Sequence, residues 1–78
     1  MKLIARIVFK LHKKIYKYPC RSEVRLGIEQ YFMNGGLTWY VGILYICQES
    51  LSDISQWVGI PKDEVIYHLN KIAKGVVL

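Results

Sequence analysis

Cysteine and histidine are scarce in this sequence, and their spacing excludes two common kinds of site. Cys20 and Cys47 lie far apart, and neither has a second cysteine or a histidine at metal-ligand spacing beside it. We therefore expect no metal site, and we expect both thiols to be free in a reducing cytoplasm. The two histidines, His12 and His68, form no Ser-His-Asp or Cys-His set that the spacing justifies. We predict that the protein is not an enzyme and uses no cofactor.

Long uninterrupted apolar runs are missing as well. The first residues, MKLIARIVFKLHKK, have a lysine at position 2 and an apolar stretch, but Arg6 and Lys10 break that stretch, which is wrong for a signal peptide. The most apolar run, residues 37–47, has about half the length needed to cross a bilayer. We expect neither secretion nor integral membrane contact.

Acidic residues are few in the first half of the chain, so the net charge of +5 is unevenly distributed. Residues 1–36 contain eight of the eleven basic residues and two acids, whereas residues 37–78 contain three lysines and four acids. Such a basic region favours phosphate binding, and it is equally compatible with an anionic membrane surface or an acidic protein partner. With 78 residues, 53% of them hydrophobic, the chain should fold as one small domain.

Apolar residues near the N-terminus recur with the period of a helix. They are Ile4, Ile7, Val8, Leu11 and Ile15, and basic residues including Lys2, Arg6, Lys10, Lys13 and Lys17 follow the opposite side. This spacing predicts a basic amphipathic helix within residues 1–18, with a strand over residues 3–9 as the lesser alternative because of its β-branched content.

Cap residues and stop signals divide the rest of the chain into helices. Ser22 is placed to cap one helix, which Asn34-Gly35-Gly36 should end, and Thr38 is placed to cap the next. The apolar faces contain Val24, Ile28, Tyr31 and Phe32 in the first of these helices and Trp39, Tyr40 and Tyr45, predicted as core, in the second. The interpretation is a small all-α bundle of four to five helices.

The last part of the chain has the pattern of a helix-turn-helix. Ser50 and Asp53 have the spacing of a capping box at the start of a helix that should run to about Val58, and Gly59-Ile60-Pro61 should form the turn. A final helix is expected over roughly residues 62–74, and residues 37–74 together form a predicted trihelical core. Ser55 supplies a small residue at the helix crossing, and the buried positions are Ile54, Val58, Ile60, Val65 and Leu69.

At Val65-Ile66-Tyr67-His68-Leu69-Asn70-Lys71-Ile72 the chain resembles the recognition helix of winged-helix regulators of the ArsR type and of LuxR (GerE-like) regulators. The sequence contains neither the β-hairpin wing of the first group nor the additional dimerisation helix of the second. The resemblance implies a DNA-binding transcriptional regulator whose last helix enters the major groove of double-stranded DNA. We expect His68 to be a structural residue that packs against the partner helix.

The candidate DNA-binding residues fall into two groups. Those of the last helix are Lys62, Ile66, Tyr67, Asn70 and Lys71, and those expected on phosphates are Lys10, Lys13, Lys14 and Lys17. Asn70 can pair with adenine and Ile66 can contact a thymine methyl group. The last helix has no arginine for guanine, and Asp63 and Glu64 should repel phosphates. We predict a homodimer formed through the apolar face of the N-terminal helix.

Two other functions fit the same residues. The first is a protein adaptor in which the helix-turn-helix-like core binds a protein and the basic helix meets an acidic partner surface. The second is peripheral attachment to an anionic membrane through the lysine-rich helix.

Overall fold

The computed structural model describes residues 17–31 and 36–75, and these form a bundle of α-helices. The helices are α2 (Arg21–Tyr31), α3 (Leu37–Ile46), α4 (Leu51–Val58) and α5 (Lys62–Ala73), and no strand occurs in this part of the chain. The prediction of a small all-α bundle is thus confirmed. The predicted N-terminal helix lies outside the described residues, apart from Lys17 and Tyr18, which form a bend. None of the four helices is long and apolar enough to cross a membrane.

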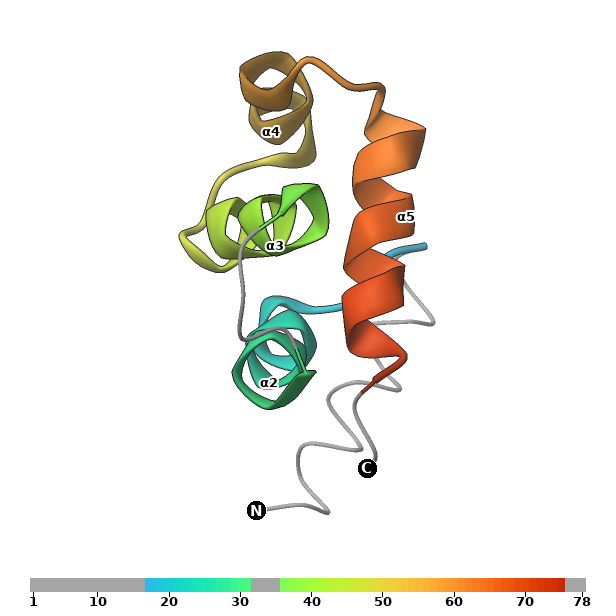
Figure 1. The fold of residues 1–78 in the computed structure, drawn as a ribbon. Helices are drawn as coiled ribbons and strands as arrows, with labels where there is room; N and C mark the ends of the chain where they lie inside the picture. Colours follow the sequence, from blue (N-terminus) through green and yellow to red (C-terminus); the bar gives the residue numbers. More distant parts are fainter. Residues whose placement is uncertain (1–16, 32–35, 76–78) are drawn as a thin grey trace.

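Three short helices are stacked along the length of one longer helix. Figure 1 shows α2, α3 and α4 one above another, each crossing α5 steeply, and each of the three contacts α5. The buried core between them consists of Val24, Ile28, Val41, Tyr45, Ile54, Val65, Leu69 and Ile72. One side of α5 is therefore covered from end to end.

Helix α2 begins two residues earlier than the sequence indicated, since Ser22 as the N-cap would have made Glu23 the first helical residue. Arg21 is already helical, and the Val24 N–H donates to the carbonyl of Cys20 at 3.2 Å, so Ser22 lies inside the first turn instead of capping it. Offsets of one or two residues are usual at helix ends. Val24 and Ile28 are buried, as their spacing predicted.

Helix α3 differs from its prediction in two respects. Its N-cap is Gly36, whose φ of 117° suits glycine, and the predicted cap Thr38 lies in the first turn with its hydroxyl directed to another helix. Of the aromatic residues expected in the core, Tyr45 is buried and Trp39 is half-buried, but Tyr40 is 39% exposed. The prediction for Tyr40 was wrong because neighbouring helices cover α3 only in part, although its sequence is apolar on nearly every side.

Arg21 connects the start of α2 to the end of α3. Its Nε and Nη2 atoms donate to the carbonyls of Tyr45 and Glu49, both at 2.8 Å, and its guanidinium lies 4.5 Å from the centroid of the Tyr45 ring. The Tyr45 hydroxyl in turn donates to the Pro19 carbonyl at 2.9 Å. A cation at this position also suits the negative end of the helix dipole.

The connection between α4 and α5 follows the predicted turn. The Ser50 hydroxyl accepts the Asp53 N–H at 3.1 Å at the start of α4, and Gly59 ends α4 with a φ of 81°. The N–H groups of Gly59 and Ile60 both donate to the Ser55 carbonyl, at 2.9 and 3.2 Å, while the Ser55 hydroxyl donates to the Ile60 carbonyl. Ser55 thus does more than leave space, because its side chain and carbonyl together fix the direction in which α5 leaves.

Candidate nucleic-acid interface

Helix α5 has one buried side and one open side. Val65, Leu69, Ile72 and Ala73 are buried against the other helices. The exposed side chains are Lys62, Asp63, Glu64, Tyr67, Lys71 and Lys74, the last at the C-cap, and Ile66, His68 and Asn70 are half-buried. The open side is what a helix needs in order to contact a large partner.

Tyr67 is the most prominent apolar group on the open side, with 60% of its surface exposed. Its ring meets the neighbouring His68 ring edge-on, with centroids 5.4 Å apart. His68 is held from behind by a hydrogen bond of 2.9 Å between its Nδ1 atom and the Thr38 Oγ1 atom of α3. This hydrogen bond supports the expected structural role of His68. It also fixes the ring against which the exposed Tyr67 packs.

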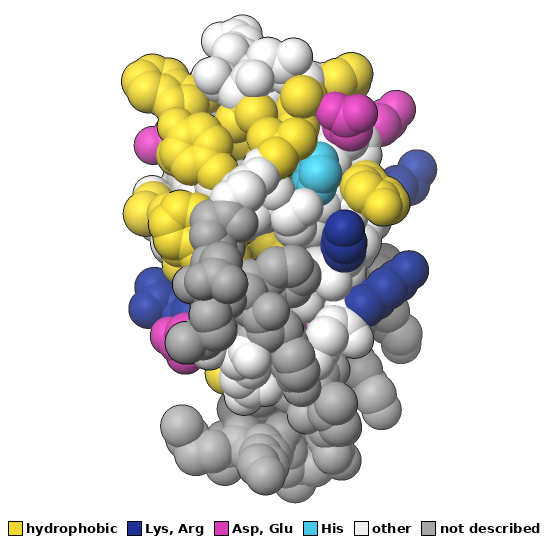
Figure 2. Space-filling model, viewed as in Figure 1, with side chains coloured by type: hydrophobic (Ala, Val, Ile, Leu, Met, Phe, Trp, Pro, Cys, Tyr) yellow, Lys and Arg dark blue, Asp and Glu magenta, His cyan; other side chains and the backbone are white. Residues whose placement is uncertain are grey.

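Charge is separated along α5. Asp63 and Glu64 are in the first turn, where Lys62 also lies, and Lys71 and Lys74 are at the other end, so all of these residues except Lys62 suit the helix dipole. Figure 2 shows the same order down the side of the molecule formed by α5, with hydrophobic side chains gathered beside it over α3 and α4. A polyanion on this helix would be attracted at its C-terminal end, whereas at the first turn Asp63 and Glu64 would repel it and Lys62 would attract it.

The whole positive surplus of the chain lies in residues 1–16, which contain five basic residues and no acid. Residues 17–31 and 36–75 contain equal numbers of acidic and basic side chains. The described residues therefore carry no net charge. Attraction to phosphates would come chiefly from residues 1–16.

The structure brings one group of predicted site residues together on α5, whereas most of the other group lies outside the described residues. Lys62, Ile66, Tyr67, Asn70 and Lys71 all lie on the open side of α5, although Ile66 and Asn70 are half-buried at its edge. Lys17 is exposed, on the bend that precedes α2, while Lys10, Lys13 and Lys14 lie outside the described residues.

Sequence reasoning missed two features of the surface. Lys74 extends the open side of α5 by one turn beyond Lys71 and Asn70. Its spacing of three and four residues from them places it on the same helix face, so it could have been included among the predicted DNA-binding residues. The second feature is a pocket between α3 and α4, to which Tyr40, expected in the core, contributes. No pattern in the sequence indicated that pocket.

The described residues contain no cluster of metal ligands, and their two cysteines are free thiols. Within residues 17–31 and 36–75, no three His, Cys, Asp or Glu side chains converge in a way that could hold a metal ion. Cys20 is buried and Cys47 is exposed, and both are free. The features on which a function can be argued are therefore the open side of α5 and the pocket. Comparison of the chain with models of protein families, with characterised proteins and with solved structures finds no match, so its own residues are the basis for assigning a function.

Proposed function

We propose that the protein is a cytoplasmic DNA-binding transcriptional regulator in which α4, the turn at residues 59–61 and α5 act as a helix-turn-helix. In this proposal α5 enters the major groove of double-stranded DNA. The observation that carries it is the position of α5: three helices support one side of it, and the opposite side is open along its length.

The dimensions of α5 suit such a role. Its 12 residues correspond to a length of about 18 Å, and the major groove is wide enough to admit one α-helix. The turn that sets its direction is held by the hydrogen bonds of Ser55, so the helix is presented rigidly. Rigid presentation matters because a recognition helix must meet base edges in one register.

Six residues on the open side of α5 have a chemically defined task in this proposal. Asn70 reads adenine through its amide, and Ile66 and Tyr67 contact thymine methyl groups. Lys62 and Lys71, at opposite ends of α5, pair with phosphates and so fix the position of the helix along the groove. Lys74 pairs with a third phosphate.

Residues 1–16 and Lys17 supply most of the electrostatic attraction. Their lysines, with Lys10, Lys13 and Lys14 foremost, neutralise phosphates and release counterions, which makes affinity steeply dependent on salt. Two copies joined through the apolar face of the predicted N-terminal helix would read two half-sites, as helix-turn-helix regulators commonly do.

A protein adaptor is the second candidate, and a specific feature favours it. Asp63 and Glu64 are exposed at the first turn of α5, where a recognition helix approaches phosphates, and the described part of the chain has no surplus of positive charge. An adaptor would use the helix-turn-helix-like core to bind a protein, and its basic N-terminal residues would meet an acidic surface of that partner.

The test is binding to mixed-sequence and selected duplex DNA, measured by fluorescence anisotropy across a salt series. Replacing Lys10, Lys13 and Lys14 together by glutamine should weaken binding to every duplex and lower the salt slope by roughly 2.7, since each neutralised phosphate accounts for about 0.9 of that slope. Tyr67→Ala and Asn70→Ala should instead weaken binding to a selected sequence more than to mixed DNA. Trp57→Ala, which changes an exposed aromatic residue outside α5, is the matched control and should bind as the wild type does.

The outcomes separate the two candidates. Absence of binding by the wild-type protein at low salt would refute the DNA proposal and leave the adaptor. Binding that the lysine variant abolishes and the α5 variants leave unchanged would refute the placement of α5 in the groove, since attraction by the N-terminal residues would then be the whole effect.

A further inference from the structure

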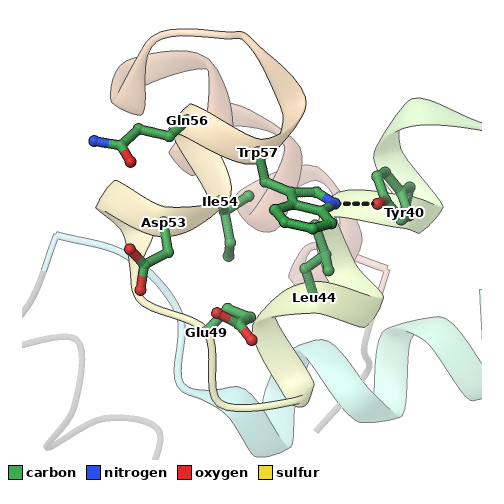
Figure 3. A pocket seen from close by; sticks show the side chains of 7 residues that line it. All are labelled: Tyr40, Leu44, Glu49, Asp53, Ile54, Gln56 and Trp57. Atoms are coloured by element: carbon green, nitrogen blue, oxygen red, sulfur yellow. Dashed lines mark hydrogen bonds between the residues drawn. The ribbon is translucent and has the colours of Figure 1, made fainter.

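A pocket of about 430 Å³ lies between α3 and α4, and none of the residues that line it belongs to α5. Leu44 and the fully buried Ile54 give it an apolar interior, while Tyr40 and Trp57 stand at its rim. Glu49, from the connection between the two helices, and Asp53 and Gln56, both from α4, complete it. In the view of Figure 3, Trp57 and Leu44 lie between Tyr40 on one side and the two carboxylates on the other.

The aromatic end of this pocket is built as a binding surface. Trp57 is 75% exposed, far more than a tryptophan with only a packing role requires. Its Nε1 atom donates to the Tyr40 hydroxyl at 2.6 Å, which joins α4 to α3 and holds the two rings in place. Leu37 is also exposed on α3. Neighbouring exposed apolar groups of this kind mark a site of interaction with another molecule.

The acidic end of the pocket determines the charge of that molecule. The pocket lining includes Glu49 and Asp53 but no lysine or arginine. Both residues are fixed at the backbone: the Glu49 carbonyl accepts a hydrogen bond from Arg21, and the Asp53 N–H is capped by Ser50. Two carboxylates beside an aromatic and aliphatic surface attract a cation with an apolar body, and they repel phosphate groups of nucleic acids or lipids.

We propose that this pocket docks a peptide segment of a protein partner in which an apolar side chain is followed by an arginine or lysine. The apolar side chain packs on Trp57, Leu44 and Ile54, and the basic side chain reaches Glu49 and Asp53. A long cationic side chain fits this surface because its methylene groups lie along the tryptophan while its charge meets the carboxylates. The proposal does not depend on DNA binding, since the pocket uses α3 and α4 and leaves the open side of α5 accessible.

The experiment is a selection of displayed random peptides on the immobilised full-length protein, with Trp57→Ala protein used to remove peptides that bind elsewhere. The best enriched sequence is then synthesised, and its affinity is measured by isothermal titration. A second synthetic peptide carries citrulline in place of its arginine, or norleucine in place of its lysine, which removes the charge and keeps an alkyl side chain. Enriched peptides should combine an apolar residue with a basic one, and the uncharged version should bind more weakly.

Substitutions in the protein supply the matched controls. Trp57→Ala should weaken binding of the synthetic peptide by roughly 30-fold, the size expected for a central aromatic anchor. Asp53→Asn should weaken it by about threefold to fivefold, as for an exposed ion pair. Asp63→Asn makes the same change in the first turn of α5 and should leave peptide affinity unchanged. Circular dichroism of each variant checks that the fold is intact.

Three results would overturn the proposal. They are a selection that enriches no peptide dependent on Trp57, enriched peptides that lack basic residues, and equal affinities for the charged and uncharged synthetic peptides. Failure of DNA binding in the same preparation would leave the proposal unaffected, because Trp57→Ala and Tyr67→Ala each test one surface.

Discussion

At Gly27, α2 lies in close contact with the backbone of α5. A Cβ atom added at Gly27 would be 2.4 Å from the Cγ2 atom of Ile72 and 2.6 Å from the Ile72 carbonyl oxygen. Ordinary contacts between carbon atoms begin at about 3.5 Å. The side-chain atom can move aside, but the carbonyl belongs to the backbone of α5, so Gly27→Ala must separate the two helices.

The size of this effect follows from two opposing terms. Alanine stabilises a helix interior by about 1 kcal/mol relative to glycine. Overpacking of a well-packed contact costs about 1–3 kcal/mol, and a backbone obstacle places Gly27 at the upper end of that range. We expect a net loss of about 2 kcal/mol in the free energy of unfolding, which for a domain of this size lowers the melting temperature by about 10 °C.

Gly42→Ala is the matched control, because Gly42 lies inside α3 and has the same gain in helix propensity. Its added Cβ would meet the Cδ1 atoms of Ile72 and Ile28, at 2.6 and 2.8 Å, which are the far ends of flexible side chains. The loss should therefore stay below about 1 kcal/mol. Both variants are compared with the wild type by thermal and urea unfolding followed by far-UV circular dichroism. A Gly27→Ala protein as stable as the wild type would refute the close packing of α2 on α5.

Three further predictions concern hydrogen bonding, proton binding and charge. Arg21→Lys keeps the positive charge but loses the guanidinium group that donates to two carbonyls. The free energy of unfolding, measured with urea, should therefore fall by about 1–2 kcal/mol. An unchanged free energy of unfolding would mean that these two hydrogen bonds do not stabilise the fold. Burial raises the pKa of the Cys20 thiol, and the Glu23 carboxylate adds to the increase. The folded state therefore keeps this proton to higher pH than the unfolded chain, so the free energy of unfolding should fall as pH rises from about 8.5 through the folded-state pKa. Cys20→Ala should remove that part of the fall, whereas a profile identical to the wild type would contradict it. Asp63→Asn should raise DNA affinity roughly threefold at low salt and less at high salt, since one repulsive charge near the phosphates is removed. Unchanged anisotropy titrations would place Asp63 away from the DNA.

Local chemistry made α4 and α5 predictable. The Ser50 cap, the left-handed Gly59 and the extended Pro61 each act within a few residues of their own position, so the ends of α4 and the start of α5 follow from neighbouring residues. Periodicity identified Val65 and Leu69 as buried for the same reason. The open side of α5, with five of the predicted DNA-binding residues, follows from that periodicity too.

Tertiary packing decided the features that depend on distant parts of the chain. Thr38 was a suitable cap by sequence, yet its hydroxyl is bonded to His68, thirty positions later in the chain. Arg21 could be assigned to a basic surface, but it binds the end of α3. Helix α3 is apolar on nearly every side, so its sequence could not indicate which side its neighbours leave open. That choice exposes Tyr40 and forms the pocket with Trp57, because which side of a uniformly apolar helix is buried depends on the helices packed around it.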